Sequence, residues 1–268
     1  MGSTQVNFSP AHEAYVKRHL KQIRNIRIVQ LLIIVSFILL WEVTTRLGIV
    51  DSFIFSSPSR VVKTFLTMSK DGIIFYHIGV TLLETLVSFS LVIIIGLLFA
   101  ILLWWNKSIA KVLEPYLVVL NSLPKSALAP VFIVWLGNNM KTIIVAAISV
   151  AVFGTIITLY TSFTSVEEDK IKLILTLGGN RRDVLFKVVL PSNISSLISV
   201  MKVNIGLSLV GVIIGEFLAA KAGLGYLIIY GSQVFKLDWV IMSIVILSFM
   251  ATGLYQLLAF FERKYKSK

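Results

Sequence analysis

Long apolar segments are the feature that most constrains how this chain of 268 residues can fold. A helix needs about 20 consecutive, mostly apolar residues to cross a bilayer. Six segments satisfy this requirement: 28–47, 78–105, 113–136, 142–163, 194–218 and 239–261. Charged residues make up only 14% of the chain, against about 25% in a soluble domain. The sequence therefore predicts an all-α integral membrane protein with about six transmembrane helices.

The parts around these spans follow from the same pattern. We expect a basic N-terminal segment (1–27), a transmembrane domain (28–261) and a basic tail (262–268). Residues 219–235 are apolar but interrupted by glycines, which favours a re-entrant or surface-lying helix over a full crossing.

The basic residues predict an orientation. Six spans place both termini on one side of the membrane. If that side is the cytoplasm, 16 Lys and Arg residues lie inside and 7 outside, while Lys125 and Lys202 fall within spans. Cytoplasmic loops are enriched in Lys and Arg, so we expect cytoplasmic termini. The net charge of +12 then needs no nucleic acid as partner.

The residues that several kinds of catalytic or metal site require are absent from the sequence. The chain has no cysteine and only three scattered histidines, so no disulfide, thiolate or H-E-x-x-H metal site is expected. It also lacks the G-x-x-x-x-G-K-[ST] phosphate loop. We expect no catalytic residues, no metal and no cofactor bound by this chain.

A polar loop (164–193) separates the fourth and fifth spans and reads "SVEEDKIKLILTLGGNRRDVLFKVVLPSN" from Ser165 onward. Apolar residues share one helical face in each half: Ile171, Ile174 and Leu175, then Val184 and Val188. Gly178 or Gly179 can adopt the left-handed turn that ends the first helix, and Pro191 suits the start of the next one. The pattern predicts two short amphipathic helices, packed either on their own bundle or on a partner.

Three segments resemble one family. Gly178, Val188, Leu190 and Pro191 match the spacing of the cytoplasmic signature E-A-A-x3-G-x9-I-x-L-P of bacterial ABC importer permeases. The segments "LPKSALAPVFIVWLG" (123–137) and "GEFLAAKAGLGYLI" (215–228) resemble blocks of the nitrate/sulfonate/taurine branch. The resemblance implies the type I ABC importer permease fold in a bacterial or archaeal plasma membrane. It also implies four kinds of partner: ABC ATPase subunits carrying ATP and Mg, a second permease chain in a homodimer, an extracytoplasmic substrate-binding protein and the lipid bilayer.

In this family the loop couples the permease to the ATPase. The resemblance therefore implies a coupling role for Lys172, Ile174, Leu175, Gly178, Gly179, Arg181, Arg182, Val188, Leu190 and Pro191. One departure concerns the E-A-A positions, which hold Lys172, Leu173 and Ile174 here. Either an acidic residue of the 167–169 segment replaces the family glutamate, or the matching ATPase position differs.

Ionisable residues inside a span are costly and usually functional. Lys125 lies between Pro124 and Pro130, so we expect it to face the transport path or to pair with Glu84 or Glu216. The fifth span has two polar or small-residue stripes: Ser195, Ser199, Lys202 and Gly206 on one face, and Asn204, Ser208, Gly211 and Gly215 on the other. One stripe is expected to line the path and the other to pack closely, as Ala147, Ala151, Gly154 and Thr158 of the fourth span also should. The candidate path residues are Ser122, Lys125, Ser199, Lys202, Asn204, Ser208, Glu84 and Glu216.

These features predict the permease subunit of an ATP-driven importer. A secondary transporter or channel is the alternative, but such proteins usually contain an internal repeat, and none is found here. The two lysines within spans favour a small anionic substrate, whereas the segment "PKSALAP" resembles the corresponding segment of permeases for pyrimidine-type vitamin precursors.

Overall fold

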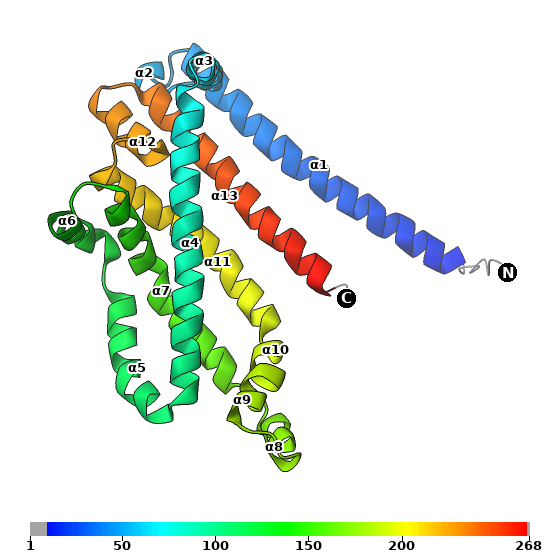
Figure 1. Cartoon of the computed structure of the whole chain (residues 1–268). Coiled ribbons are helices and arrows are strands. Elements are labelled where there is room, and N and C mark those ends of the chain that lie inside the picture. Colours follow the sequence, from blue (N-terminus) through cyan, green and yellow to red (C-terminus); the bar gives the residue numbers. More distant parts are fainter. Residues whose placement is uncertain (1–9, 267–268) are drawn as a thin grey trace. The chain divides into compact units, whose positions relative to one another are not determined.

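The computed structural model describes residues 10–266, with side chains from 15 to 264 (Figure 1). Every regular element in this range is helical. The chain divides into two compact units, residues 1–63 and 64–268, and each is described by itself. The prediction of an all-α protein is confirmed.

The first unit contains α1 (Pro10–Arg46), α2 (Ser52–Phe55) and the beginning of α3 (Pro58–Lys70). Helix α1 continues from the basic segment into the first apolar segment without interruption, so no structural boundary falls at residue 27. All side chains from 31 to 40 are exposed within the chain, as expected for a helix surrounded by lipid.

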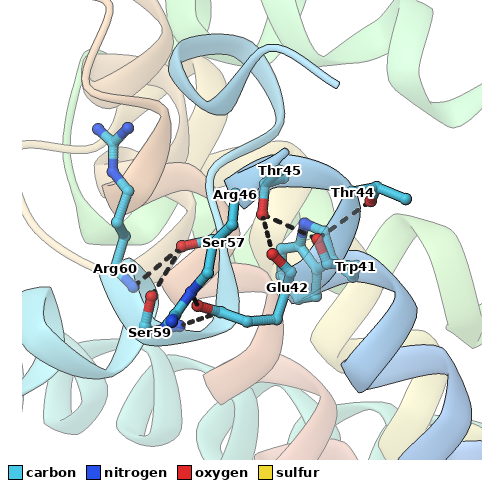
Figure 2. A network of polar contacts seen from close by, with 8 residues as sticks. All are labelled: Trp41, Glu42, Thr44, Thr45, Arg46, Ser57, Ser59 and Arg60. Atoms are coloured by element: carbon cyan, nitrogen blue, oxygen red, sulfur yellow. Dashed lines mark hydrogen bonds and ion pairs between the residues drawn. The ribbon is translucent and has the colours of Figure 1, made fainter. Parts of the chain in front are cut away.

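A polar network closes the C-terminal end of α1 (Figure 2). The Glu42 carboxylate accepts hydrogen bonds from Arg46 Nε at 2.6 Å and from the backbone N–H of Ser59 at 3.0 Å. The hydroxyl of Thr45 donates to the carbonyl of Trp41 at 2.8 Å. Glu42, which interrupts the first apolar segment, therefore ties the end of α1 to the start of α3.

Three long helices form the core of the second unit: α4 (Ile73–Trp105), α7 (Met140–Thr164) and α11 (Ile194–Ala219). They pack side by side (Figure 1) because small residues let their backbones approach. A Cβ added at Gly211 would lie 2.6 Å from Ala147 Cα, and one at Gly215 would lie 2.9 Å from Ile143 Cα. Gly211 and Gly215, in the C-terminal part of the Asn204–Gly215 stripe of α11, therefore form its close contact with α7.

The predicted third span is not a straight helix. It consists of α5 (Lys107–Ser122) and α6 (Lys125–Leu136), bent by 95° at a short break. Proline has no N–H to continue the helix and disfavours a helical conformation in the preceding residue. Leu123, directly before Pro124, is accordingly extended, with ψ 140°.

Shorter elements complete the unit. Helices α8 (Glu168–Thr176) and α9 (Arg181–Val184), a π-helical segment (Leu185–Val189) and α10 (Leu190–Ser192) form the 164–193 loop. Helix α12 (Leu224–Gln233) has only 10 residues, and α13 (Leu237–Lys266) follows. Between residues 10 and 266, five helices are long and apolar enough to span a membrane, and the bent pair gives up to six spans.

Candidate functional site

A half-open cavity of about 410 Å³ lies between α7, α11 and the end of α5. Five polar side chains contribute to its lining: Asn121, Thr155, Thr158, Ser199 and Asn204. The remaining lining residues are apolar or glycine, so the wall carries hydrogen-bonding groups but no charged side chain.

Asn204 and Thr155 are the two buried polar residues of this wall, with 3% and 2% of their surfaces exposed. The hydroxyl of Thr155 lies 3.0 Å from Asn204 Oδ1 and 2.7 Å from the carbonyl oxygen of Ala151. The amide nitrogen of Asn204 has no hydrogen-bond partner within the described part of the chain. Because this nitrogen is not among the buried unpartnered atoms, its N–H groups are open to hydrogen bonding with a polar solute or water in the cavity.

Two of the predicted path residues line this cavity, and others do not. Ser199 and Asn204 are part of the wall, and the hydroxyl of Ser199 also donates to the carbonyl of Ser195 at 2.9 Å. Ser122 follows Asn121 but directs its hydroxyl to the carbonyl of Val118 at 2.9 Å. Ser208, which belongs to the same stripe of α11 as Gly211 and Gly215, is fully buried, and its hydroxyl has no partner among the described residues.

The ammonium group of Lys125 is bound to its own backbone. It donates to the carbonyl oxygens of Leu120, Asn121 and Leu123 at 2.5–2.9 Å. These carbonyls belong to the C-terminal end of α5, where the freed acceptors and the helix dipole favour a cation. Neither Glu84 nor Glu216 contacts Lys125 in the part of the chain that the structure describes, so the ion pair considered from the sequence is absent there.

Lys202 is paired with a residue far along the chain. Its ammonium lies 2.6 Å from the Glu262 carboxylate of α13. Both side chains are mostly buried, at 17% and 13% exposure. Glu262 was not predicted from the sequence, because the pair joins residues separated by 60 positions.

Glu216 anchors the short helix α12. Its carboxylate accepts hydrogen bonds from the hydroxyl of Thr81 at 2.6 Å and from the backbone N–H of Gly225 at 2.5 Å. Leu224 N–H donates to Thr81 Oγ1 at 2.8 Å, and Gly223 N–H donates to His77 Nδ1 at 3.0 Å. The buried backbone N–H groups at the start of α12, which have no acceptor within the helix, are thus satisfied by α4 and α11 side chains.

The second acidic candidate belongs to the same cluster. Glu84 is 2% exposed, and its carboxyl group interacts with that of Glu216. Its Oε2 atom has no partner among the described residues. Neither acid lines the cavity of Asn204.

Gly178 makes the turn of the 164–193 loop. Its φ of +81° is left-handed, while Gly178 N–H donates to Leu175 O at 3.1 Å and Gly179 N–H donates to Ile174 O at 2.9 Å. This pair of bonds is the Schellman arrangement that satisfies the last carbonyls of a helix. Gly179 is needed for space, because a Cβ there would lie 2.6 Å from Ile174 Cγ2.

The helix after the turn begins with a capping box. Asn180 Oδ1 accepts from the N–H groups of Arg182 and Asp183, and Asp183 Oδ2 accepts from Asn180 N–H at 3.0 Å. The hydrogen bond from Lys187, at 2.7 Å, holds the pKa of the Asp183 carboxyl below its usual range, and the Asn180 N–H acts in the same direction. The ionised Asp183 therefore stabilises this turn above its unfolded pKa.

The loop has an inner face that packs on its own bundle. Val184, Leu185 and Val189 belong to a buried cluster with Phe163 of α7, and Val188 is only 8% exposed. Two further predicted coupling residues, Ile174 and Leu190, pack against this cluster. For this face, the structure shows packing on the permease's own bundle, which is one of the two alternatives that the sequence left open.

The outer face carries different residues. Leu173, Leu177 and Phe186 are 59%, 75% and 65% exposed, next to exposed Lys172 and Arg182. Leu175 and Pro191 are also exposed. The first three were not predicted from the sequence. For two of them the spacing was an available signal, because Leu173 and Phe186 lie two residues after Ile171 and Val184 and hence on the opposite side of each helix. Lys172 lies 3.4 Å from Glu168 and 3.7 Å from Asp169, so these acids neutralise the lysine at the E-A-A position.

Comparison with known proteins assigns the family. Residues 92–267 match the model of the binding-protein-dependent transport system inner membrane component. The chain belongs to this family. It is a multi-pass permease of ABC importers, and membership implies an ATPase and a substrate-binding protein as partners.

Individual relatives agree with this assignment. The formylaminopyrimidine transport permease protein ThiX of Halalkalibacterium halodurans is 26% identical over 195 residues, covering 73% of this permease and 77% of ThiX. The putative aliphatic sulfonates transport permease protein SsuC of Bacillus subtilis is 25% identical, covering 87% and 85%. An inward-facing structure of the MetNI methionine ABC transporter has a TM-score of 0.63 at 18% identity, covering 72% of this permease and 95% of that chain. The MetNI likeness shows the shared type I importer fold.

Proposed function

We propose that this permease forms the path for a small uncharged solute that is rich in hydrogen-bonding groups, such as a pyrimidine-type heterocycle. The observation that carries this proposal is the uncharged polar wall formed by Asn121, Thr155, Thr158, Ser199 and Asn204. Carboxamide and hydroxyl groups donate and accept hydrogen bonds, which matches ring nitrogens and exocyclic amino groups.

An anionic substrate fits this wall less well. The sequence suggested an anion because Lys125 and Lys202 fall within spans. However, Lys125 is bound to three carbonyls of α5, and Lys202 is paired with Glu262. Neither lysine contributes to the cavity lining. ThiX, named for formylaminopyrimidine transport, and SsuC, named for aliphatic sulfonates, represent the two substrate classes.

The assembly is part of the proposal. The cavity is half-open, so a second copy of the permease can close it. We infer a homodimer with two ATPase chains, which bind ATP and Mg and supply the hydrolysis that this non-catalytic chain does not perform. The distribution of 16 Lys and Arg residues on one side and 7 on the other supports cytoplasmic termini and a cytoplasmic 164–193 loop. The exposed Leu173, Leu177 and Phe186 then face the ATPase.

The test is uptake into proteoliposomes that contain the permease, its ATPase and its binding protein. We expect ATP-dependent uptake of a labelled aminopyrimidine and no competition from an aliphatic sulfonate. Asn204→Leu should impair uptake, and Asn204→Gln, which keeps the amide, should retain more of it. Uptake without ATPase subunits would contradict the importer mechanism, whereas ATP-dependent uptake of the sulfonate alone would contradict only the uncharged substrate.

A further inference from the structure

A second cavity, of about 440 Å³, lies between the C-terminal ends of α4 and α7, the start of α5 and the 164–193 loop. Most of its lining is apolar, including Leu103, Tyr160, Phe163 and Ile171. Three cationic side chains also line it: Lys107, Lys111 and Arg181. The path proposed above does not use this cavity.

The positive charge of the cavity is largely unbalanced. Lys107 and Lys111 are one helical turn apart at the start of α5, so they project from the same face. Neither has an ion-pair partner within the described residues. The one acidic lining residue, Glu168, is paired with Lys172 at 3.4 Å. The N-terminal end of α5 adds positive potential from the helix dipole.

Arg181 is held in place at the rim. Its guanidinium lies 5.5 Å from the ring centre of Trp104 and 5.4 Å from that of Trp105, and it donates to the carbonyl of Trp104 at 3.2 Å. The cavity adjoins an open hollow that Lys107 and Arg181 also line, together with Trp105, Asn106 and Ser108. Paired tryptophans at the end of a span are typical of the membrane–water interface, so the three cations lie at the depth of lipid head groups.

We propose that this cavity binds the head group of an anionic phospholipid, whose phosphate meets Lys107, Lys111 and Arg181 while its glycerol and upper acyl carbons cover the apolar wall. A soluble anion matches the charges but leaves the apolar wall uncovered, and a lipid satisfies both. The bound lipid contacts α4, α5 and the 164–193 loop together. It therefore joins the loop to the membrane-spanning core.

The experiment measures lipid retention by native mass spectrometry. The full-length permease is purified in mixed phosphatidylglycerol and phosphatidylcholine, both alone and with its ATPase. Lys107→Gln/Lys111→Gln is compared with Lys17→Gln/Lys21→Gln, a control that removes two exposed lysines at the same spacing from α1. We expect retained phosphatidylglycerol to fall about fivefold per lysine, on the order of 30-fold in the first variant, and to be nearly unchanged in the control.

Other outcomes decide against the proposal. Equal retention of phosphatidylglycerol by wild type and Lys107→Gln/Lys111→Gln, or an equal loss in the control, would overturn it. Displacement of the lipid when the ATPase binds would assign the cavity to a protein partner instead. Arg181→Lys keeps the charge but loses the planar stacking on Trp104 and Trp105, so it should lose less phosphatidylglycerol than Lys107→Gln/Lys111→Gln does. If the melting temperature shows that Lys107→Gln/Lys111→Gln is unfolded, lipid retention by Arg181→Lys decides the test. Because retention needs no transport, the result is independent of the substrate assignment.

Discussion

Replacing Gly178 with valine should uncouple ATP hydrolysis from solute uptake. Gly178 has a φ of +81°, and a Cβ at this position would have no neighbour within 4 Å. The cost of substitution is therefore conformational: a left-handed L-residue costs about 1–2 kcal/mol, and a β-branched residue is especially unsuited to it. A change of this size reduces the population of the correct turn by a factor of about 5–30. Helices α8 and α9 would then present Leu173, Leu177 and Phe186 in the wrong relative positions.

The measurement is the number of ATP molecules hydrolysed per solute imported, in proteoliposomes with matched amounts of permease. Gly178→Asn is the control, because asparagine adopts the left-handed conformation more readily than valine does. It should retain coupling. Gly179→Ala should also be impaired, but for a steric reason, since its Cβ would lie 2.8 Å from the carbonyl oxygen of Ile174. Wild-type coupling in Gly178→Val, or equal defects in Gly178→Val and Gly178→Asn, would refute the assignment of this turn.

Two further predictions concern the membrane-spanning core. Lys125→Met should lower both the melting temperature and the uptake rate, because the α5 carbonyls lose a cation worth on the order of 1 kcal/mol. Lys125→Arg, which keeps the charge, should retain most of both. Additional removal of Glu84 or Glu216 should not rescue the methionine variant, and a rescue would support an ion pair with that carboxylate instead. Gly211→Val should destabilise the permease by about 1–3 kcal/mol, because α7 and α11 must separate to accommodate the side chain. Gly206→Ala is its matched control on α11, since a Cβ there has no neighbour within 4 Å, and similar thermal unfolding of the two variants would disprove the packing argument.

Local patterns in the sequence were sufficient for much of this structure. Long apolar runs located the spans, and the glycine pair located the loop turn at Gly178. The same information could not decide which face of a helix packs, because the two stripes of α11 are similar in polarity. That decision depends on Ala147 and Ile143 of α7, which only the folded chain brings next to α11. The bend between α5 and α6 was likewise signalled by Pro124, but its angle of 95° was not.

The roles of the ionisable residues within spans could not be decided from the sequence for the same reason. From the sequence, Lys125, Lys202, Glu84 and Glu216 appeared as candidates for the transport path, because a charge in a membrane is costly without a function. Pairing partners supply a structural function instead. Lys202 meets Glu262 across 60 positions, and Glu216 holds the backbone of α12, where a Cβ at Gly225 would lie 2.8 Å from its carboxylate. This contact gives a physical reason for the glycines of the "GLGYLI" block: they leave room for a buried acid that caps a helix. With these charges engaged in holding helices together, the proposed transport path leaves solute recognition to uncharged groups such as Asn204.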